Sequence, residues 1–307
     1  MCAQLAAGKN SLLIGVTAEG TAEDGSPIDG NAVCQENAQN SLRTALDLDP
    51  EHAQAEHMLA AMLAAGNGEP GEGGGGVSKA SPAFVKALFD DFSGSFDEKL
   101  AALGYAVPKL LGEAIKAHVA QARGGRPFRT ALDAGCGTGL AGPYLRPLVQ
   151  RTLAGVDLSP KMLEKAAMLT VEGAQPVYDQ LSATDLVTLQ LEEVLPAAEV
   201  AGKFELVAAA DVLVYFGELL ELLASLARLS SDASVLIFSC ERATDEEAPD
   251  GWRLRPSGRF AHTRAYVEGM AARAGGFQLV SYEEIVPRME YGKPVHGHLF
   301  VFMRGRK

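Results

Sequence analysis

Cysteine is scarce in this sequence. The four cysteines, Cys2, Cys34, Cys136 and Cys240, lie far apart and form no Cys-x-x-Cys pair. This spacing predicts neither a zinc site nor a disulfide framework, and it favours a reducing compartment. No apolar run approaches the roughly 20 residues of a membrane span, and residues 11–17 are too short and poorly flanked for a secretion signal. We therefore expect a cytoplasmic protein without a membrane partner.

Positive charge is also scarce. The 307 residues include 27 Lys and Arg against 39 Asp and Glu, which gives a formal net charge of -12, and the one basic cluster is residues 304–307. Nucleic-acid-binding proteins usually carry a basic patch, so we expect no nucleic-acid partner and favour a small-molecule or protein substrate. Hydrophobic residues make up 47% of the chain, which is ample for one large or two modest domains.

Residues 129–157 hold the strongest pattern in the chain. A short buried strand is predicted over 129–134, and it runs into Gly-Cys-Gly-Thr-Gly, a turn that glycine makes without strain, before a helix begins over 140–145. A second apolar run, 152–156, ends on Asp157. At the carboxyl end of a parallel strand an acid can hold the hydroxyls of a ribose. The two strands therefore predict a nucleoside pocket.

The spacing of the glycines indicates which nucleoside binds. A dinucleotide fingerprint is Gly-x-Gly-x-x-Gly, whereas this loop reads Gly-x-Gly-x-Gly and has Leu140 where the third glycine would be. Asp133 precedes the loop by two residues, and its carboxylate would attract an ammonium group and repel a phosphate. The pattern favours S-adenosylmethionine, which has an amino-acid end and no phosphate. The alternative is a glycine turn in a parallel sheet that binds nothing.

Residues 132–139 and 155–163 resemble the first two motifs of class I S-adenosylmethionine-dependent methyltransferases. They read Leu-Asp-Ala-Gly-Cys-Gly-Thr-Gly and Gly-Val-Asp-Leu-Ser-Pro-Lys-Met-Leu. The resemblance implies a Rossmann-like α/β fold, a parallel sheet with an antiparallel terminal hairpin, and S-adenosylmethionine as the cofactor. The expected cofactor-binding residues are Asp133, Gly135, Cys136, Gly137, Thr138, Gly139, Asp157, Leu158, Met162, Asp185, Leu186, Asp211 and Phe96.

Two of these residues are assigned from the resemblance alone. Asp185 follows a weak third strand over 177–182, and in the family an acid at this place accepts a hydrogen bond from the adenine amino group. Phe96 belongs to a region with two Phe-Asp pairs that resembles the lid over the cofactor in small-molecule methyltransferases. The alternatives are a helix cap for Asp185 and a core position for Phe96.

The N-terminal part of the chain divides by composition. Residues 1–30 show no periodicity and are expected to be disordered or loosely ordered. Residues 31–66 have helical spacing broken by a proline and resemble about one tetratricopeptide repeat, with a plain helical hairpin as the alternative. The glycine-rich residues 67–80 read as a linker. Residues 81–307 then form the class I domain, beginning with lid helices over 81–124.

The second half of the chain supplies the rest of the predicted sheet. The predicted elements are strands over 204–211, 235–240, 277–286 and 298–302, an irregular stretch over 242–261, and a helix over 262–274. The last two strands suit an antiparallel hairpin. The fourth strand ends in Asp-Val-Leu-Val-Tyr-Phe, which is not the Asn/Asp-Pro-Pro-Tyr type of methyltransferases that act on planar nitrogens, and this argues against DNA adenine or a glutamine amide as acceptor.

Four further segments resemble a family of methyltransferases that carry a tetratricopeptide segment ahead of the catalytic domain. They are Phe-Asp-Glu-Lys-Leu at 96–100, Ala-Ala-Asp-Val-Leu-Val-Tyr-Phe at 209–216, Ser-Gly-Arg-Phe-Ala-His-Thr-Arg-Ala-Tyr-Val at 257–267, and Tyr-Gly-Lys-Pro-Val-His-Gly-His-Leu at 291–299. This resemblance implies the cofactor and leaves the acceptor open.

The residues predicted for the acceptor half lie at the carboxyl ends of strands or on the loops that follow them. They are Tyr215, Glu241, Arg259 and His262. His262 is the predicted general base, because an ordinary histidine pKa of about 6.5 suits this work at neutral pH; a helix cap is the alternative. Arg259 could hold a carboxylate. His296 and His298 share a strand face but lack a third ligand, so no metal is predicted.

Three functions agree with these patterns. The first is a methyltransferase for a small-molecule acceptor, with O- or carboxyl-methylation favoured. The second is a methyltransferase whose helical segment delivers a protein or peptide acceptor, since helical repeats offer concave binding surfaces. The third is an inactive scaffold protein that binds the cofactor.

Overall fold

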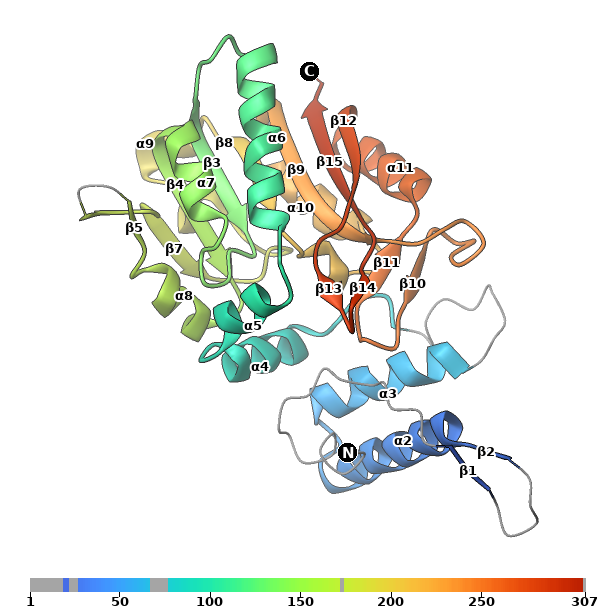
Figure 1. Ribbon diagram of the computed structural model, residues 1–307. Coiled ribbons are helices and arrows are strands. Elements are labelled where there is room, and N and C mark those ends of the chain that lie inside the picture. Colours follow the sequence, from blue (N-terminus) through green and yellow to red (C-terminus); the bar gives the residue numbers. More distant parts are fainter. Residues whose placement is uncertain (1–18, 22–26, 67–76, 172–173, 306–307) are drawn as a thin grey trace.

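The structure is a computed structural model, and it describes residues 19–21, 27–66, 77–171 and 174–305. Most of the expected loose N-terminus and most of the expected linker therefore lie outside the described residues. Figure 1 shows a twisted sheet with helices on both faces and a pair of N-terminal helices beside it. None of the helices in the described part of the chain is long and apolar enough to cross a membrane.

The central sheet has the strand order β7–β4–β3–β8–β9–β15–β12. Neighbours from β7 to β9 are parallel, whereas β15 runs antiparallel to both β9 and β12. The strands are β3 (Phe128–Ala134), β4 (Val149–Asp157), β7 (Gln180–Ala183), β8 (Phe204–Ala209), β9 (Ser230–Arg242), β12 (Phe277–Ile285) and β15 (Gly297–Arg304). The predicted parallel sheet with an antiparallel terminal hairpin is confirmed.

Adjacent residues of one strand face opposite layers of helices. Ala131 packs in the core that includes α6 (Val107–Ala122) and α7 (Gly142–Leu145), whereas Leu132 packs in the core that includes α10 (Leu220–Leu229) and α11 (Arg264–Gly275). In Figure 1, α6 lies in front of the sheet and α10 behind it. Successive side chains of a strand point to opposite faces, so a strand buried on both sides reads as a continuous apolar run.

Two helices begin at a serine that precedes a proline, as the sequence predicted. Ser81 Oγ accepts the N–H of Phe84 at 3.2 Å at the start of α4 (Pro82–Phe92), and Ser159 Oγ accepts the N–H of Met162 at 3.2 Å at the start of α8 (Pro160–Ala166). Proline suits the first helical position because its missing N–H has no partner there. Helix α4 and the next helix, α5 (Phe96–Ala102), lie at the carboxyl ends of the parallel strands (Figure 1).

The stretch over 242–261, predicted to be irregular, contains two short strands. β10 (Trp252–Leu254) and β11 (Phe260–His262) pair antiparallel, and β11 continues the sheet in parallel with the end of β9. The turn between them includes Gly258 at φ +79°, a conformation that glycine adopts at little cost. The helix expected from 262 begins two residues later, because Thr263 is its cap, and His262 belongs to the strand.

The N-terminal helices α2 (Gly30–Leu48) and α3 (Ala53–Gly66) form a helical hairpin. Its identity as a tetratricopeptide repeat stays a prediction. The remaining short elements are β1 (Glu19–Thr21), β2 (Pro27–Asp29), β5 (Thr170–Val171), β6 (Gln175–Pro176), α9 (Ala197–Val200), β13 (Met289–Glu290), β14 (Lys293–Pro294), and single 3-10 turns at Arg146–Leu148, Leu191–Glu193 and Leu213–Tyr215.

Helix α3 packs directly on the β10–β11 hairpin. Ala61 is 0% exposed and belongs to one apolar cluster with Leu254 and Phe260. Trp252, the one tryptophan of the chain, packs edge-on against Phe260 at 5.4 Å between ring centroids. The elements on the two sides of the predicted linker are therefore in contact, and part of the apolar surface of the hairpin is covered by α3.

Replacing Ala61 by Glu should separate α3 from the hairpin. A carboxylate would be buried here in an apolar cluster, and we expect a loss of about 3 kcal/mol in the free energy of unfolding together with a red shift of Trp252 fluorescence. Leu63→Glu is the matched control, because Leu63 lies on the same helix and is exposed. Equal melting temperatures for the two variants would contradict the docking of α3.

Candidate functional site

A pocket lies at the carboxyl ends of β3, β4 and β8 and is closed by α4 and α5. Parallel sheets bind their ligands at this edge. The predicted site residues that line it are Asp133, Gly135, Cys136, Gly137, Thr138, Asp157, Leu158, Asp185, Leu186, Asp211, Phe96, Tyr215 and Arg259. The structure thus brings together residues from six segments of the chain.

The glycine loop is held by the acid of the second strand. Asp157 Oδ2 accepts the N–H of Gly137 at 2.9 Å, and its Oδ1 accepts the N–H of Ser159 at 2.8 Å. Gly135 has φ +69°, and a Cβ there would come within 2.4 Å of Val212 Cγ2. Any larger residue at this position would therefore be strained and would displace the chain that follows β8.

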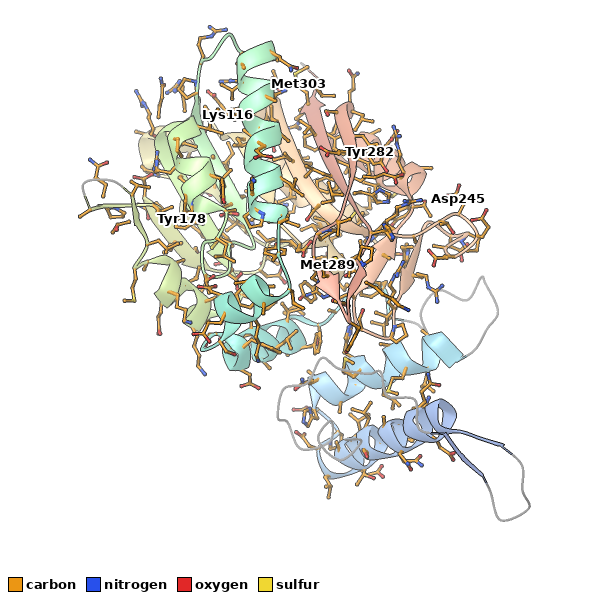
Figure 2. The ribbon with its side chains drawn as sticks, in the orientation of Figure 1. Lys116, Tyr178, Asp245, Tyr282, Met289 and Met303 are labelled. Carbon is orange, nitrogen blue, oxygen red and sulfur yellow. The ribbon has the colours of Figure 1, made fainter. Side chains whose placement is uncertain are left out.

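Asp133 is a buried carboxylate at the inner wall of the pocket. It is 1% exposed, and Tyr178, labelled in Figure 2, donates its hydroxyl to Oδ2 at 2.6 Å. Burial raises the pKa of Asp133 to about 7; the bond from Tyr178 acts against this rise and the nearby Asp157 adds to it. No cation pairs with Asp133 among the described residues. The site therefore suits the ammonium group of a ligand and disfavours a phosphate.

The residues that follow β7 form another part of the pocket wall. Thr184, Asp185, Leu186 and Val187 line the pocket there. Asp185 Oδ1 accepts the N–H of Val187 at 2.9 Å, which fixes the side chain. Its second oxygen has no hydrogen-bond partner in the part of the chain that the structure describes, so it can accept a bond from an amino group of a bound base.

In each Phe-Asp pair of the lid, the phenylalanine lines the pocket and the aspartate accepts a hydrogen bond from a loop after β3 or β4. Phe89 and Phe96 line the pocket and meet edge-on at 5.8 Å. Asp90 Oδ1 accepts the hydroxyl of Ser159 at 2.6 Å, and Asp97 Oδ1 accepts the hydroxyl of Thr138 at 2.6 Å. The aromatic rings thus cover the pocket, while the acids attach the two lid helices to the loops after β3 and β4.

Arg259 reaches the pocket at its other end, beneath the lid. Its side chain is 17% exposed, and its Nη1 lies 3.6 Å from Glu241 Oε1 and 3.9 Å from Asp211 Oδ2. Both distances exceed a hydrogen bond, and Arg259 Nη1 has no hydrogen-bond partner among the described residues. A guanidinium group that is largely desolvated and incompletely paired can bind an anion strongly.

Arg288 is the hydrogen-bond donor for Glu241, the acid that lies next to Arg259. The side chain of Arg288 is 2% exposed, its Nη2 donates to Glu241 Oε1 at 2.6 Å, and its Nε donates to Glu290 at 2.7 Å. Burial alone would raise the pKa of Glu241, but Arg259 and Arg288 lower it, and the net direction is downward. Asp211 is held by the hydroxyl of Ser239 at 3.0 Å. The acids near Arg259 thus have other donors.

Two tyrosines complete this end of the pocket. Tyr105 and Tyr215 both line it, and Phe89 packs edge-on against Tyr215 at 5.6 Å. Burial raises the pKa of both hydroxyl groups, so both remain protonated at neutral pH. Neither hydroxyl has a hydrogen-bond partner in the described ranges, which leaves two neutral donors beside Arg259. Tyr105, Arg288 and Tyr178 are not predicted by the sequence, because a single such residue outside a motif carries no signal of its own.

His262 does not reach the pocket, and its predicted role as general base does not agree with the structure. It is 0% exposed, and its Nε2 donates to the carbonyl of Phe216 at 2.8 Å. Burial is the main cause that lowers the pKa of His262 to about 4. Because it lies three positions after Arg259 along an extended chain, its side chain points to the opposite face.

Three other predicted site residues also lie outside the lining of the pocket. Glu241 is buried beneath Arg259. Met162 is buried in α8. Gly139 turns away from the pocket, and a Cβ there would come within 2.6 Å of Leu169. These three residues lie behind the lining, and their predicted roles stay predictions.

Comparison with known proteins identifies the domain. Residues 132–236 match the family described as a methyltransferase domain. The human Methyltransferase-like protein 27 is 36% identical over 121 residues, which is 39% of this chain and 43% of that protein. Residues 132–236 thus belong to a methyltransferase domain. The match spans less than half the length of the human relative, and the family match begins after the N-terminal helices.

Two solved structures share the fold of this methyltransferase domain. The 1,6-didemethyltoxoflavin-N1-methyltransferase of Burkholderia thailandensis, bound to its substrate and S-adenosylhomocysteine, is 19% identical; the match covers 74% of this chain and 91% of that chain, with a TM-score of 0.51. A methyltransferase of Clostridium acetobutylicum is 17% identical over 71% of this chain and 99% of that chain, with a TM-score of 0.50. At these identities the likeness establishes the fold alone.

The pocket of the methyltransferase domain fits its cofactor, S-adenosylmethionine. Asp133 has the carboxylate for the ammonium group, Asp157 lies where the ribose hydroxyls would bind, and Asp185 has a free oxygen for the adenine amino group. The bound cofactor supplies a methyl group on a positively charged sulfur. Phe89 and Phe96 line the pocket with apolar rings, which would exclude water from a bound cofactor.

Binding of S-adenosylhomocysteine to the methyltransferase domain should weaken as the pH falls. The ammonium group binds the ionised form of Asp133, whose pKa is about 7 in the free protein. We therefore expect a dissociation constant about tenfold higher at pH 6 than at pH 8, measured by calorimetry. In Asp133→Asn the affinity should be lower, with a flatter pH dependence. A flat profile in the unsubstituted protein would contradict this role of Asp133.

Burial of neutral His262 should make the domain less stable in acid. Its pKa is about 4 in the folded protein and about 6.5 when unfolded, so its contribution is fully present above pH 6.5 and is lost as the pH falls toward 4. We expect this group alone to remove about 2 kcal/mol between pH 7.5 and pH 5. The difference in unfolding free energy between the protein and His262→Asn should shrink by this amount, with exposed His296→Asn as control. A constant difference would contradict the depressed pKa.

Proposed function

We propose that this methyltransferase acts on a small-molecule acceptor and transfers the methyl group to a carboxylate oxygen. The observation that carries the proposal is Arg259, whose Nη1 has no hydrogen-bond partner at the end of the pocket away from Asp133. Arginine matches a carboxylate with two parallel hydrogen bonds. Tyr105 and Tyr215 add two neutral donors beside it.

The groups around this end of the pocket favour a carboxylate over a neutral hydroxyl acceptor. A hydroxyl group must lose a proton during transfer, whereas a carboxylate is already ionised at pH 7 and needs no general base. The predicted base, His262, is buried outside the pocket. The protein's own part is then to hold an acceptor oxygen in line with the methyl group and to exclude water.

The lining predicts the body of the acceptor as well as its charged group. Phe89, Phe96, Leu100, Val212 and Phe216 surround the space between the two ends. Apolar and aromatic side chains favour an apolar ligand body, while few polar groups fix its orientation. We therefore propose a carboxylic acid with an apolar body. Delivery of a protein acceptor by α2 and α3 is the competing proposal.

The product identifies the acceptor class directly. The full chain would be incubated with a metabolite extract and methyl-labelled cofactor, and the labelled products would be divided by size and treated with mild alkali. A methyl ester releases labelled methanol, whereas a methyl ether or methylamine does not. Alkali-labile label in the small-molecule fraction supports the proposal. Label that resists alkali, or label on protein, would overturn it.

Arg259→Lys should weaken binding of the acceptor and leave binding of the cofactor unchanged. An ammonium group cannot make the two parallel bonds of a guanidinium group, so we expect the KM for the acid found in the extract to rise about tenfold. The dissociation constant of S-adenosylhomocysteine should stay the same. Arg255→Lys is the matched control, since Arg255 lies on the same hairpin but donates to the carbonyl of Arg242. Equal KM values in the two variants would remove Arg259 from the acceptor site.

A further inference from the structure

His57 of the N-terminal helix α3 makes a buried contact with the hairpin that carries Arg259. The side chain is 4% exposed, and Nε2 lies 2.7 Å from the carbonyl oxygen of Gly258. A carbonyl oxygen only accepts, so Nε2 carries the proton and donates. Burial is the main cause that lowers the pKa of His57, which agrees with a neutral ring. This is a bond between residues 201 positions apart in the chain.

The carbonyl that accepts this hydrogen bond belongs to the peptide bond that joins Gly258 to Arg259. A peptide group is planar, so holding its oxygen also sets the direction in which the chain enters Arg259. Two bonds across the turn complete this fixation: Arg255 N–H donates to Arg259 O at 2.8 Å, and Gly258 N–H donates to Arg255 O at 2.9 Å. The Cα–Cβ direction of Arg259, and with it the approach of the guanidinium group, depends on this turn.

The same histidine also contacts the lid. Its ring stacks on Phe84 of α4, with 4.2 Å between ring centroids and 26° between planes. Phe84 is buried in one apolar cluster with Tyr215, and α4 also carries the pocket residues Val85 and Phe89. A single side chain of α3 is therefore placed between the lid helix and the arginine turn, the two elements that border the acceptor end of the pocket.

We propose that His57 is a positioning residue for the acceptor, and that helix α3 is an integral part of the acceptor site. His57 holds the Gly258–Arg259 peptide through its Nε2 proton and seats α4 through its ring, so that Arg259 faces an acceptor carboxylate beneath a closed lid. The inference deepens the proposed function and rests on Arg259 as the anchor of that carboxylate.

Variants of the full chain can separate the two contacts of His57. His57→Phe keeps a ring for Phe84 and removes the donor, whereas His57→Gln keeps an N–H donor and removes the ring. Leu63→Phe is the control, since Leu63 lies on the same helix α3 and is exposed. Hydrogen exchange of the segment from β10 to β11 reports the turn. Calorimetry with benzoate and benzamide, at saturating S-adenosylhomocysteine, reports carboxylate-dependent binding.

In His57→Phe we expect the amides of the turn to exchange about tenfold faster and the preference for benzoate over benzamide to fall at least fivefold. The affinity for S-adenosylhomocysteine should stay unchanged, and His57→Gln should restore most of both losses. Unchanged exchange in His57→Phe would overturn the proposal. So would faster exchange with an unchanged preference for benzoate, or equal losses in the Phe and Gln variants together with weaker cofactor binding, which indicate a merely structural role.

Failure of the proposed function gives a different pattern. The unsubstituted protein could bind benzamide and benzoate with equal affinity, and Arg259→Lys could change neither affinity. In that case Arg259 is not a carboxylate anchor, and the proposed role of His57 toward an acceptor is wrong as well. Hydrogen exchange in His57→Phe then still decides whether His57 holds the turn.

Discussion

The buried ion pair between Arg288 and Glu241 sets the electrostatic environment of Arg259 at its end of the pocket. Removing Glu241 would leave Arg288 with Glu290 and the more distant Asp211, and removing Arg288 would leave Glu241 with Arg259 at 3.6 Å, so either loss would leave a buried charge less completely paired and would destabilise the fold. Their 2.6 Å bond joins the end of β9 to the connection between β12 and β15. Because Glu241 is satisfied by Arg288, it attracts Arg259 without hydrogen-bonding to it. A guanidinium group thus stays available to a ligand in an interior where an isolated cation would not be stable.

The two halves of the pocket differ in how they are assembled. In the cofactor half, Gly137 and Asp157 are 20 residues apart and Asp133 and Tyr178 are 45 apart, so one β-α-β unit and the next strand build most of it. The lid is attached to the same loops through acids next to the covering phenylalanines. The end near Arg259 instead joins residues from the lid, from β8 and β9, from the β10–β11 hairpin and from the connection between β12 and β15.

This difference explains what could be predicted from the sequence. The cofactor half follows from glycine spacing and from the rule that parallel strands end at one edge, and the same rule placed Asp211 and Tyr215 at the pocket. It failed for His262, because loop membership does not determine side-chain direction. Once residues 260–262 are extended, Arg259 and His262 must face opposite ways. Arg288 could not be found, since a lone arginine in a hairpin connection looks the same as a solvated one.

The contact of α3 with the domain had no signal in the sequence for a related reason. Its glycine-rich connection predicted a linker and gave no sign of where α3 would pack. Closing a longer loop costs only about 0.6 kcal/mol per doubling of length, so a small apolar patch and one buried hydrogen bond can outweigh that cost. The contact depends on small residues at two positions. Ala61 lets α3 approach the hairpin, and at Gly258 a Cβ would already lie 3.0 Å from Met58 Sδ. Close approach is what allows the ring of His57 to reach a backbone carbonyl, and no pattern of apolar periodicity marks a position where a side chain must be absent.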